Sequence, residues 1–475
     1  MSVSSAALAA PSPLLYPGCP RWVAVAVACL SSFMVVMDGA IVNVALPAMQ
    51  ADLGLSAVEL QWVVDAYLLT LGGFMLLTAR ASDLYGRKAI LQSGLVLFTL
   101  ASLAGGFAGS GPALLAARAF QGLGASALAT STLAVIVAVH PNGSGRETAI
   151  SLWAASSALA AAFGVTIGGV LTAFADWRWV MFVNAPVGAL LSLIVAASLK
   201  PPAPAAQRPT LDLVGALAIT LCLGSFILGV TQSVHWGWES PLVRGALGGA
   251  LALLVLFVAV EARVEQPLVR LGIFRLRNIL FGNALVMGLG AALTASMFLL
   301  SVVLQRIAGY GALDAGLAML PMSLSLAVAA IASRPLRDAG FNRLPFVGGL
   351  VGAVGMAWLS RIPAVPDYVA DLLGPTLLVG GGLGLMIMTA TQAALAGVPG
   401  KDVGLASGLL NTARQLGGAV GVAALATLAQ AVARDAAGDG SVAAALAGYH
   451  AAFLATAAVC VTAALASLFL RRSPE

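Results

Sequence analysis

Three ionisable side chains stand inside long apolar stretches and are the first candidates for chemistry. Asp38 lies in "VVMDGAIVNVALP", Asp65 in "QWVVDAYLLT" and Arg118 in "RAFQGLGAS". A charge at the centre of a membrane-spanning helix costs roughly 2.5 to 3.5 kcal/mol on insertion scales, so such a residue usually has a partner or serves a transport pathway. We therefore expect these residues to carry a function that offsets the cost of placing them there.

A shared depth would let these residues handle a proton. The helical rise of about 1.5 Å per residue places Asp38 about 24 Å along a helix that begins near Trp22. Burial disfavours a charged carboxylate and a nearby arginine favours it, so the cluster could hold an ion pair in one state and a proton in another. The alternatives are that Asp65 sits in the outer headgroup region and that Arg118 is only a structural partner of Asp38.

The elements that position these residues are expected to be membrane-spanning helices. The chain has 475 residues, of which 60% are hydrophobic and only 9% are charged, whereas a soluble protein carries about 25% charged residues. Apolar runs longer than about 18 residues indicate spanning helices, and we expect about fourteen of them. The predicted fold is an all-α integral membrane fold of two six-helix bundles with two inserted helices.

The expected domains follow from composition. We predict an N-terminal tail (1–21), an N-terminal six-helix bundle (22–199), a proline-rich linker (200–210), two inserted helices (211–263), a basic surface segment (264–277), a C-terminal bundle (278–471) and a short tail (472–475). The linker "KPPAPAAQRPT" has the composition of an extended spacer. The surface segment is expected to lie along the membrane, with Arg263, Arg270, Arg275 and Arg277 facing anionic lipid.

The distribution of basic residues predicts the topology. Most Lys and Arg residues fall in loops on the side that holds both termini, so both termini are expected to be cytoplasmic. Because the basic residues are scattered rather than gathered on one face, we expect no nucleic-acid partner. No stretch before Trp22 has the pattern of a removable signal peptide.

Enzymatic chemistry is not expected. The four cysteines lack CxxC spacing, so neither a disulfide nor a metal site is predicted. We find no nucleotide-binding loop, metal cluster or nucleophile constellation, and His140, His235 and His450 fall in separate regions. The sequence thus predicts a protein that is not an enzyme and needs no cofactor.

Two further motifs suggest moving or closely packed helices. The short loop "ARASDLYGRKA" gathers Asp83, Gly86, Arg87 and Lys88 into one turn, where glycine permits a close backbone approach. Positive-inside anchoring would account for its basic residues alone. In "ALAAAFGVTIGGV", Gly164 and Gly168 form a small-residue face that another helix could approach closely, although generic helix packing would give the same pattern.

A weak internal repeat accompanies the two-bundle prediction. "RAFQGLGAS" and "RQLGGAVG" each place an arginine and a glutamine before glycines. Internal repeats of this kind are common in transporters, but chance similarity is the alternative.

These motifs together resemble the fourteen-helix drug:proton antiporter family of the major facilitator superfamily, from about Trp22 to Phe469. "MDGAIVNVALP" matches the family's first-helix motif at Asp38, Asn43, Ala45 and Pro47, with Ala40 where threonine is common. "RAFQGLGAS" resembles the fourth-helix motif, and "DWRWVMFVNAPVG" and "GLASGLLNTARQLGGAVG" are typical of the fourteen-helix members. The resemblance implies that Arg118 takes part in proton coupling.

Two motifs depart from the family pattern. The loop "ARASDLYGRK" is similar to the family's gating turn but has Ala79 for its first glycine and Leu84 for a basic residue. In the antiporter motif of helix five, Gly164, Gly168 and Gly169 match, but Val165 stands where proline is usual. Since proline bends a helix by removing a backbone hydrogen bond, this change leaves the direction of antiport open.

The implied activity is proton-coupled efflux of hydrophobic or amphipathic, commonly cationic, small molecules by alternating access. The expected setting is a bacterial-type cytoplasmic (inner) membrane, in which the protein functions as a monomer. Asp38 or Asp65 could attract a cationic substrate, whereas Arg414 could favour an anionic one or brace the second bundle. The candidate cavity residues are Asn43, Tyr67, Gln121, Asn283, Met297, Gln392, Asn411 and Arg414.

Two other functions remain compatible with the sequence. The same fold could export or flip an endogenous metabolite or lipid. A membrane scaffold or sensor without transport activity is the second possibility, because the turn and helix-five motifs are altered.

Overall fold

Helices make up the described part of the chain. The computed structural model describes residues 14–140, 144–200, 211–264, 267–341, 343–395, 403–436 and 442–470. The elements are α1 (Arg21–Leu53), α2 (Ala57–Tyr85), α3 (Arg87–Gly106), α4 (Gly111–Val139), α5 (Ser144–Phe174), α6 (Arg178–Phe182), α7 (Asn184–Ser198), α8 (Leu213–Trp236), α9 (Pro241–Glu261), η1 (Leu271–Arg275), α10 (Arg277–Arg306), α11 (Ala312–Asp338), α12 (Leu344–Leu359), η2 (Tyr368–Leu373), α13 (Gly374–Leu395), α14 (Val403–Ala436) and α15 (Val442–Ser467). The all-helical fold class is confirmed.

Local sequence sets the ends of these helices, as the first turn shows. α1 ends at Gly54, whose φ of 63° is the left-handed conformation that glycine adopts without steric cost. α2 then begins after Ser56, whose side chain accepts a hydrogen bond from the Glu59 amide while the Glu59 carboxylate accepts one from the Ser56 amide. This capping box satisfies backbone donors that the first turn of a helix leaves unpaired.

The expected count of fourteen spans is not confirmed by length and composition. Among the described residues, twelve helices are long and apolar enough to cross a membrane, with α6 and α7 counted as one span, Arg178–Ser198. Two shorter apolar stretches are Phe163–Phe174 of α5 and the whole of α12, Leu344–Leu359. Both lie within the helical bundles.

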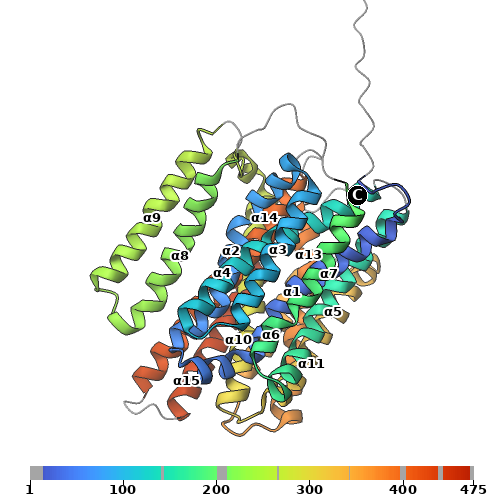
Figure 1. The fold of residues 1–475 in the computed structure, drawn as a ribbon. Coiled ribbons are helices and arrows are strands. Elements are labelled where there is room, and N and C mark those ends of the chain that lie inside the picture. The colour runs from blue at the N-terminus through green and yellow to red at the C-terminus, as the bar shows by residue number, and fades with distance from the viewer. Residues whose placement is uncertain are drawn as a thin grey trace, which may run out of the picture.

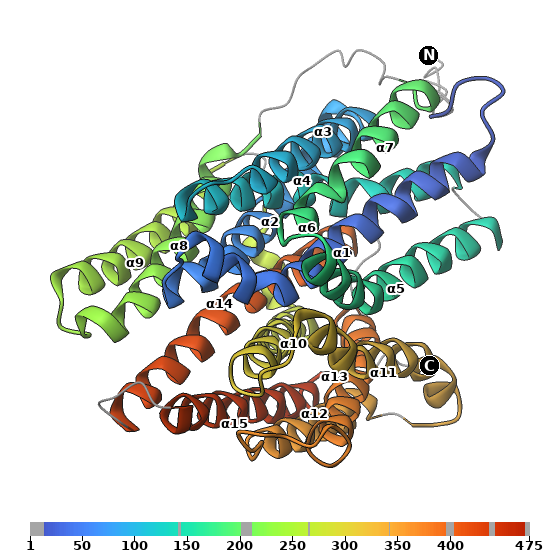
Figure 2. The same cartoon turned by 60° about the horizontal axis from the view of Figure 1, so that its bottom comes forward.

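The helices form two groups that are in contact with each other. α1 packs against α5 and α2 against α4 in the first group, while α10 packs against α14 and α11 against α13 in the second. Figure 2 shows these groups side by side. They touch where α5 meets α11, where α2 meets α14 and where α1 meets α10 and α11. The domain ranges stay a prediction, and the linker beyond Lys200, the first 13 residues and the tail 472–475 lie outside the described residues.

Both ends of the described chain lie on one side, here called the terminal side. The Lys200 amide donates to the Leu14 carbonyl over 2.8 Å, which holds the first described residues against the end of α7. At the other end of the chain, the Phe469 ring stacks on Phe281 near the start of α10 at 5.2 Å. Figure 1 shows α1 beginning and the chain ending at the same end of the molecule.

α8 and α9 form a hairpin beside the two groups. α8 contacts α9, α2 and α14, and α9 lies farther out (Figure 1). Only 11% of the most apolar stretch of α9 is buried within the protein. The exposed apolar surface of this helix suits contact with lipid.

The basic segment after α9 packs on protein through its apolar side. Leu268, Val269 and Ile273 are buried in one cluster with Leu77 of α2 and Leu409 of α14. Arg263, Arg270, Arg275 and Arg277 are exposed. The apolar side of the segment therefore contacts neighbouring helices, and the predicted position of its arginines against anionic lipid stays a prediction.

Candidate functional site

A buried polar cluster surrounds Asp38. Its Oδ2 atom accepts a hydrogen bond from Arg118 Nη1 at 2.6 Å, and the two side chains are 0% and 1% exposed. Its Oδ1 atom accepts from Gln121 Nε2 and from Asn184 Nδ2, each at 2.8 Å. Both oxygens of the carboxylate are thus satisfied, which is the condition under which a buried charge is tolerated.

Several helices of the first group supply and position this cluster. Asp38 comes from α1, Arg118 and Gln121 from α4, and Asn184 from the first residue of α7. Arg118 Nε also donates to the Val63 carbonyl of α2 at 3.0 Å. These bonds tie α1, α2, α4 and α7 together at one point.

Tyr67 of α2 completes the surroundings of Arg118. The guanidinium carbon lies 4.3 Å from the centre of the Tyr67 ring, a cation–π geometry. The Tyr67 hydroxyl donates to the Val35 carbonyl of α1 at 3.1 Å. Tyr67 was predicted as a cavity residue, but in this structure it is buried and packs beneath the ion pair.

Asp65 lies on a different face of α2 from Val63 and Tyr67, which contact Arg118. It is 0% exposed, and its Oδ2 atom accepts from Gln61 Nε2 at 3.0 Å. Its Oδ1 atom has no hydrogen-bond partner among the described residues. One turn along, the Leu68 side chain lies 3.5 Å from where a methyl group on Gly418 of α14 would be, so this face of α2 lies toward the second group. The structure joins Asp38 to Arg118 and places Asp65 apart, at the contact between the groups and inside the protein.

Sequence reasoning did not single out Asn184 or Ser102. Asn184 lies within the quoted stretch "DWRWVMFVNAPVG", directly after the interruption at Val183 that separates α6 from α7. Ser102 of α3 accepts a hydrogen bond from Gln121 at 2.8 Å. Each is an uncharged polar residue inside an apolar run, and this pattern could have drawn attention to it. Which neighbour such a side chain faces depends on the rotation of its helix, which the sequence does not give.

The other predicted cavity residues divide by exposure. Asn43, Gln121 and Met297 are buried, and the Asn43 side chain donates to the Gly39 carbonyl of its own helix. The remaining candidates are at least partly exposed: Asn283, Gln392, Asn411 and Arg414. Asn283 is on α10, while Asn411 and Arg414 are on the adjacent α14.

The predicted gating turn consists of a single residue between two helices. Gly86, with φ of 96°, separates the last residue of α2 from Arg87 of α3. Lys88 donates to the carbonyls of Ala196, at 3.0 Å, and of Leu199 at the end of α7. Asp83 is exposed on the last turn of α2. The turn thus connects α3 to α7 within the first group.

The glycines of the helix-five motif lie at close helix contacts. A methyl group on Gly164 would lie 2.8 Å from Ala40 Cβ, and one on Gly168 would lie 2.7 Å from the Ile41 carbonyl oxygen, both on α1. A methyl group on Gly169 would lie 2.7 Å from the Ala312 carbonyl oxygen of α11. One turn of α5 therefore packs against both groups of helices.

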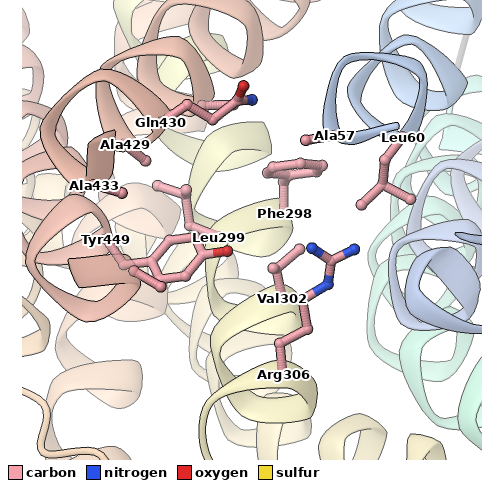
Figure 3. A pocket seen from close by; sticks show the side chains of 12 residues that line it. Ala57, Leu60, Phe298, Leu299, Val302, Arg306, Ala429, Gln430, Ala433 and Tyr449 are labelled. Carbon is pink, nitrogen blue, oxygen red and sulfur yellow. The ribbon is translucent and has the colours of Figure 1, made fainter. Parts of the chain in front are cut away.

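A small cavity lies between the groups on the side opposite the termini. Its volume is about 100 Å³, and Figure 3 shows Phe298 and Arg306 of α10 facing Leu60 of α2 and Tyr449 of α15 across it. Pockets that hold drug-sized ligands measure roughly 300 to 1,000 Å³. This cavity is therefore too small in this state to hold such a molecule.

Two hydrogen bonds join α10 to α1 beside the stretch of α10 that lines this cavity. The Ser301 hydroxyl of α10 donates to the Asn43 carbonyl of α1 at 2.6 Å, and Gln305 Nε2 donates to the Val44 carbonyl at 3.0 Å. Asn43 and Val44 follow Asp38 by less than two turns, so the polar cluster and the contact between the groups share one helix.

Comparison with known proteins agrees with this architecture. Residues 28–422 match the sequence profile described as the Major Facilitator Superfamily. The chain belongs to this superfamily. It is a multi-pass membrane transporter that acts on a small molecule, and it is not an enzyme.

Relatives and solved structures of the superfamily extend the comparison. The transporter is 37% identical to a cephamycin export protein of Amycolatopsis lactamdurans over 85% of its own chain and 84% of that protein. It is 39% identical to a puromycin resistance protein of Streptomyces alboniger over 90% and 84% of the two chains. Its fold is similar to an inward-open xylose transporter of E. coli, with a TM-score of 0.64 at 14% identity over 96% and 97% of the chains.

Proposed function

We propose that this transporter exports hydrophobic or amphipathic small molecules in exchange for protons, by alternating access. Its relatives include proteins named for cephamycin export, puromycin resistance and multidrug resistance, which supports an export role. We place it in a bacterial-type cytoplasmic membrane as a functional monomer with both termini cytoplasmic.

The buried pair of Asp38 and Arg118 carries the proton-coupling part of the proposal. Each charge is compensated by the other at 2.6 Å, and both side chains are at most 1% exposed. When a proton neutralises Asp38, Arg118 becomes a buried cation without a counter-charge, an arrangement that costs several kcal/mol. Proton uptake therefore favours a rearrangement of the helices that hold the pair.

α1 can transmit that rearrangement to the second group. Asp38 stands on the same helix as Asn43 and Val44, whose carbonyls accept the hydrogen bonds from Ser301 and Gln305 of α10. A shift of α1 that accompanies release of Arg118 would strain these two bonds. Opening of the opposite side would follow from loss of this contact, as rigid-body rocking between bundles requires.

Asp65 is the carboxylate suited to meet a cationic group of the substrate. Asp38 already accepts hydrogen bonds on both oxygens, whereas Asp65 has an oxygen without a partner among the described residues. Asp65 also faces the contact between the groups. We therefore assign proton coupling to Asp38 and Arg118, and cation recognition to Asp65.

Gradient-driven efflux of a fluorescent lipophilic cation tests the proposal. Cells with the parent protein should extrude the dye, and a protonophore should abolish the extrusion. Asp38→Asn at matched membrane abundance should lose it, because an amide cannot cycle a proton. Asp52→Asn is the control, since that carboxylate is 44% exposed in a peripheral pair with Arg178.

The outcomes separate the functions. Unchanged gradient-driven efflux by Asp38→Asn would refute the coupling role of Asp38. Absence of dye efflux by the parent would favour export or flipping of an endogenous metabolite or lipid, which a competition panel would identify. A protein inert toward the whole panel would favour the scaffold function.

A further inference from the structure

Arg414 is a charge inside the second group that the ion pair of the first group does not explain. It lies eleven residues into α14, about 16 Å from the start of the helix. Its Nη2 atom donates to Asn411 Oδ1, one turn away, at 2.9 Å. Asn411 is neutral and orients the guanidinium without balancing its charge.

No carboxylate of the described residues compensates Arg414. The salt bridges among the described residues join Asp38, Asp52, Asp176 and Glu239 to other arginines. An unpaired charge in a membrane-spanning helix is tolerated when it lines a water-filled cavity or meets a ligand. Arg414 is partly exposed, which agrees with a position at the edge of such a space.

The backbone contacts of α14 place this residue between the two groups. The Arg414 carbonyl lies against Gly290 of α10, which lacks a side chain at this contact. One turn along α14, a methyl group on Gly418 would lie 3.4 Å from Thr294 Cβ of α10 and 3.5 Å from Leu68 Cδ1 of α2. The face that carries Arg414 and Gly418 thus borders α10 of the second group and α2 of the first.

Polar, partly exposed residues continue this face. Asn411 and Arg414 of α14, together with Asn283 and Thr294 of α10, are each partly exposed although their helices span the membrane. Lipid would not suit these side chains, whereas a hydrated passage for substrate would.

We propose that Arg414 binds an acidic group, a carboxylate, of the exported molecule, and that Asn411 positions the guanidinium for it. Arginine presents a planar fork of donors that matches a carboxylate and keeps its charge at every physiological pH. Asn411 holds one of its nitrogens, which limits the rotation of the fork. This inference rests on the proposed export function and names a chemical group that its substrate carries.

Asp65 and Arg414 together define a zwitterionic substrate. Leu68 and Gly418 lie at about one level, because a methyl group on Gly418 would lie 3.5 Å from Leu68 Cδ1. Asp65 is three residues away on one side of this level and Arg414 is four residues away on the other, which separates their backbones by roughly 10 Å along the helices. An amphipathic molecule with a cationic and an acidic end can contact both residues.

A pair of dyes that differ only in their carboxyl group tests the assignment. Rhodamine 110 has a free carboxylate, and rhodamine 123 is its methyl ester. Binding of each to the full-length protein in phosphatidylcholine nanodiscs is measured by fluorescence polarisation, without a proton gradient. We expect Arg414→Gln to weaken rhodamine 110 binding at least tenfold and rhodamine 123 binding less than twofold. Arg414→Lys should lose severalfold for rhodamine 110 alone.

The controls make each result decisive. Arg343→Gln removes an exposed arginine and should leave both affinities within twofold of the parent. If Arg414→Gln still binds rhodamine 123, the methyl ester, the variant is folded. If Arg414→Gln does not fold, Arg414→Lys replaces it in the comparison of the two dyes. Equal losses for both dyes, no loss for either, or no binding of rhodamine 110 by the parent would overturn the proposal. Because no gradient is applied, failure of proton coupling would leave this binding result intact.

Discussion

The energetics of the Asp38–Arg118 pair can be measured by a double-mutant cycle. Arg118→Gln leaves the Asp38 Oδ2 atom without its 2.6 Å partner and without a counter-charge in a site 0% exposed. Breaking a buried pair by removing one partner costs about 3 to 5 kcal/mol. Asp38→Asn should cost a similar amount, because Arg118 then keeps only the Val63 carbonyl and Gln121 Oε1 as acceptors.

The double variant should be more stable than the sum of the single effects predicts. If the two effects were independent, the double variant would lose roughly 6 to 10 kcal/mol of stability. With both charges removed, no uncompensated charge remains, so we expect the double variant to lose less stability than either single variant. The assay is the temperature of half-unfolding of the purified protein in detergent. We expect the double variant to unfold at or above the temperature of each single variant.

A peripheral ion pair supplies the matched control. Asp52 and Arg178 approach to 2.7 Å but are 44% and 30% exposed, so Asp52→Asn and Arg178→Gln should each cost less than about 1 kcal/mol and combine additively. Additive losses at Asp38 and Arg118 would refute the account of a mutually compensated buried pair. The stable double variant should still fail in gradient-driven efflux, and retained efflux would assign the pair a structural role alone.

Two glycine substitutions test the helix contacts. Gly169→Ala should lower stability by about 1 to 3 kcal/mol, because the new methyl group would lie 2.7 Å from the Ala312 backbone of α11. The control is Gly245→Ala, where nothing lies within 4 Å of the new methyl group. Equal unfolding temperatures for the two variants would contradict the prediction. Gly86→Ala should cost about 1 to 3 kcal/mol, since φ of 96° strains any residue with a side chain. Limited proteolysis between α2 and α3 should then become faster, and an unchanged rate would argue against strain at this turn.

The sequence predicted the buried pair because charge inside an apolar run has few explanations. Asp38 and Arg118 stand 80 residues apart, yet each needs a partner in the membrane, and the structure joins them. Asp65 followed the same logic but lies on another face of α2. Depth along a helix follows from residue spacing, whereas the rotation of the helix depends on packing with neighbours that the sequence does not identify.

The internal repeat shows a related limit. The sequence paired "RAFQGLGAS" of α4 with "RQLGGAVG" of α14, but these helices are not equivalent in the fold. α14 packs on α10 and α2 as α5 packs on α1 and α11. The glycines reveal the equivalence: Gly417 and Gly421 approach α10 as Gly164 and Gly168 approach α1. The shared arginine and glutamine suggested that α4 and α14 correspond. The four-residue spacing of the glycines, which α5 and α14 share, matches the helices that are equivalent in the structure.

The position of the α8–α9 hairpin makes two of the lines along which the groups meet, α2–α14 and α5–α11, unequal. The hairpin stands beside the line where α2 meets α14 and contacts both helices. Among the described residues, neither α8 nor α9 packs in this way against α5 or α11. A compound dissolved in the bilayer that approaches the α2–α14 line from this side would therefore meet the hairpin first, and the α5–α11 line has no such cover among the described residues.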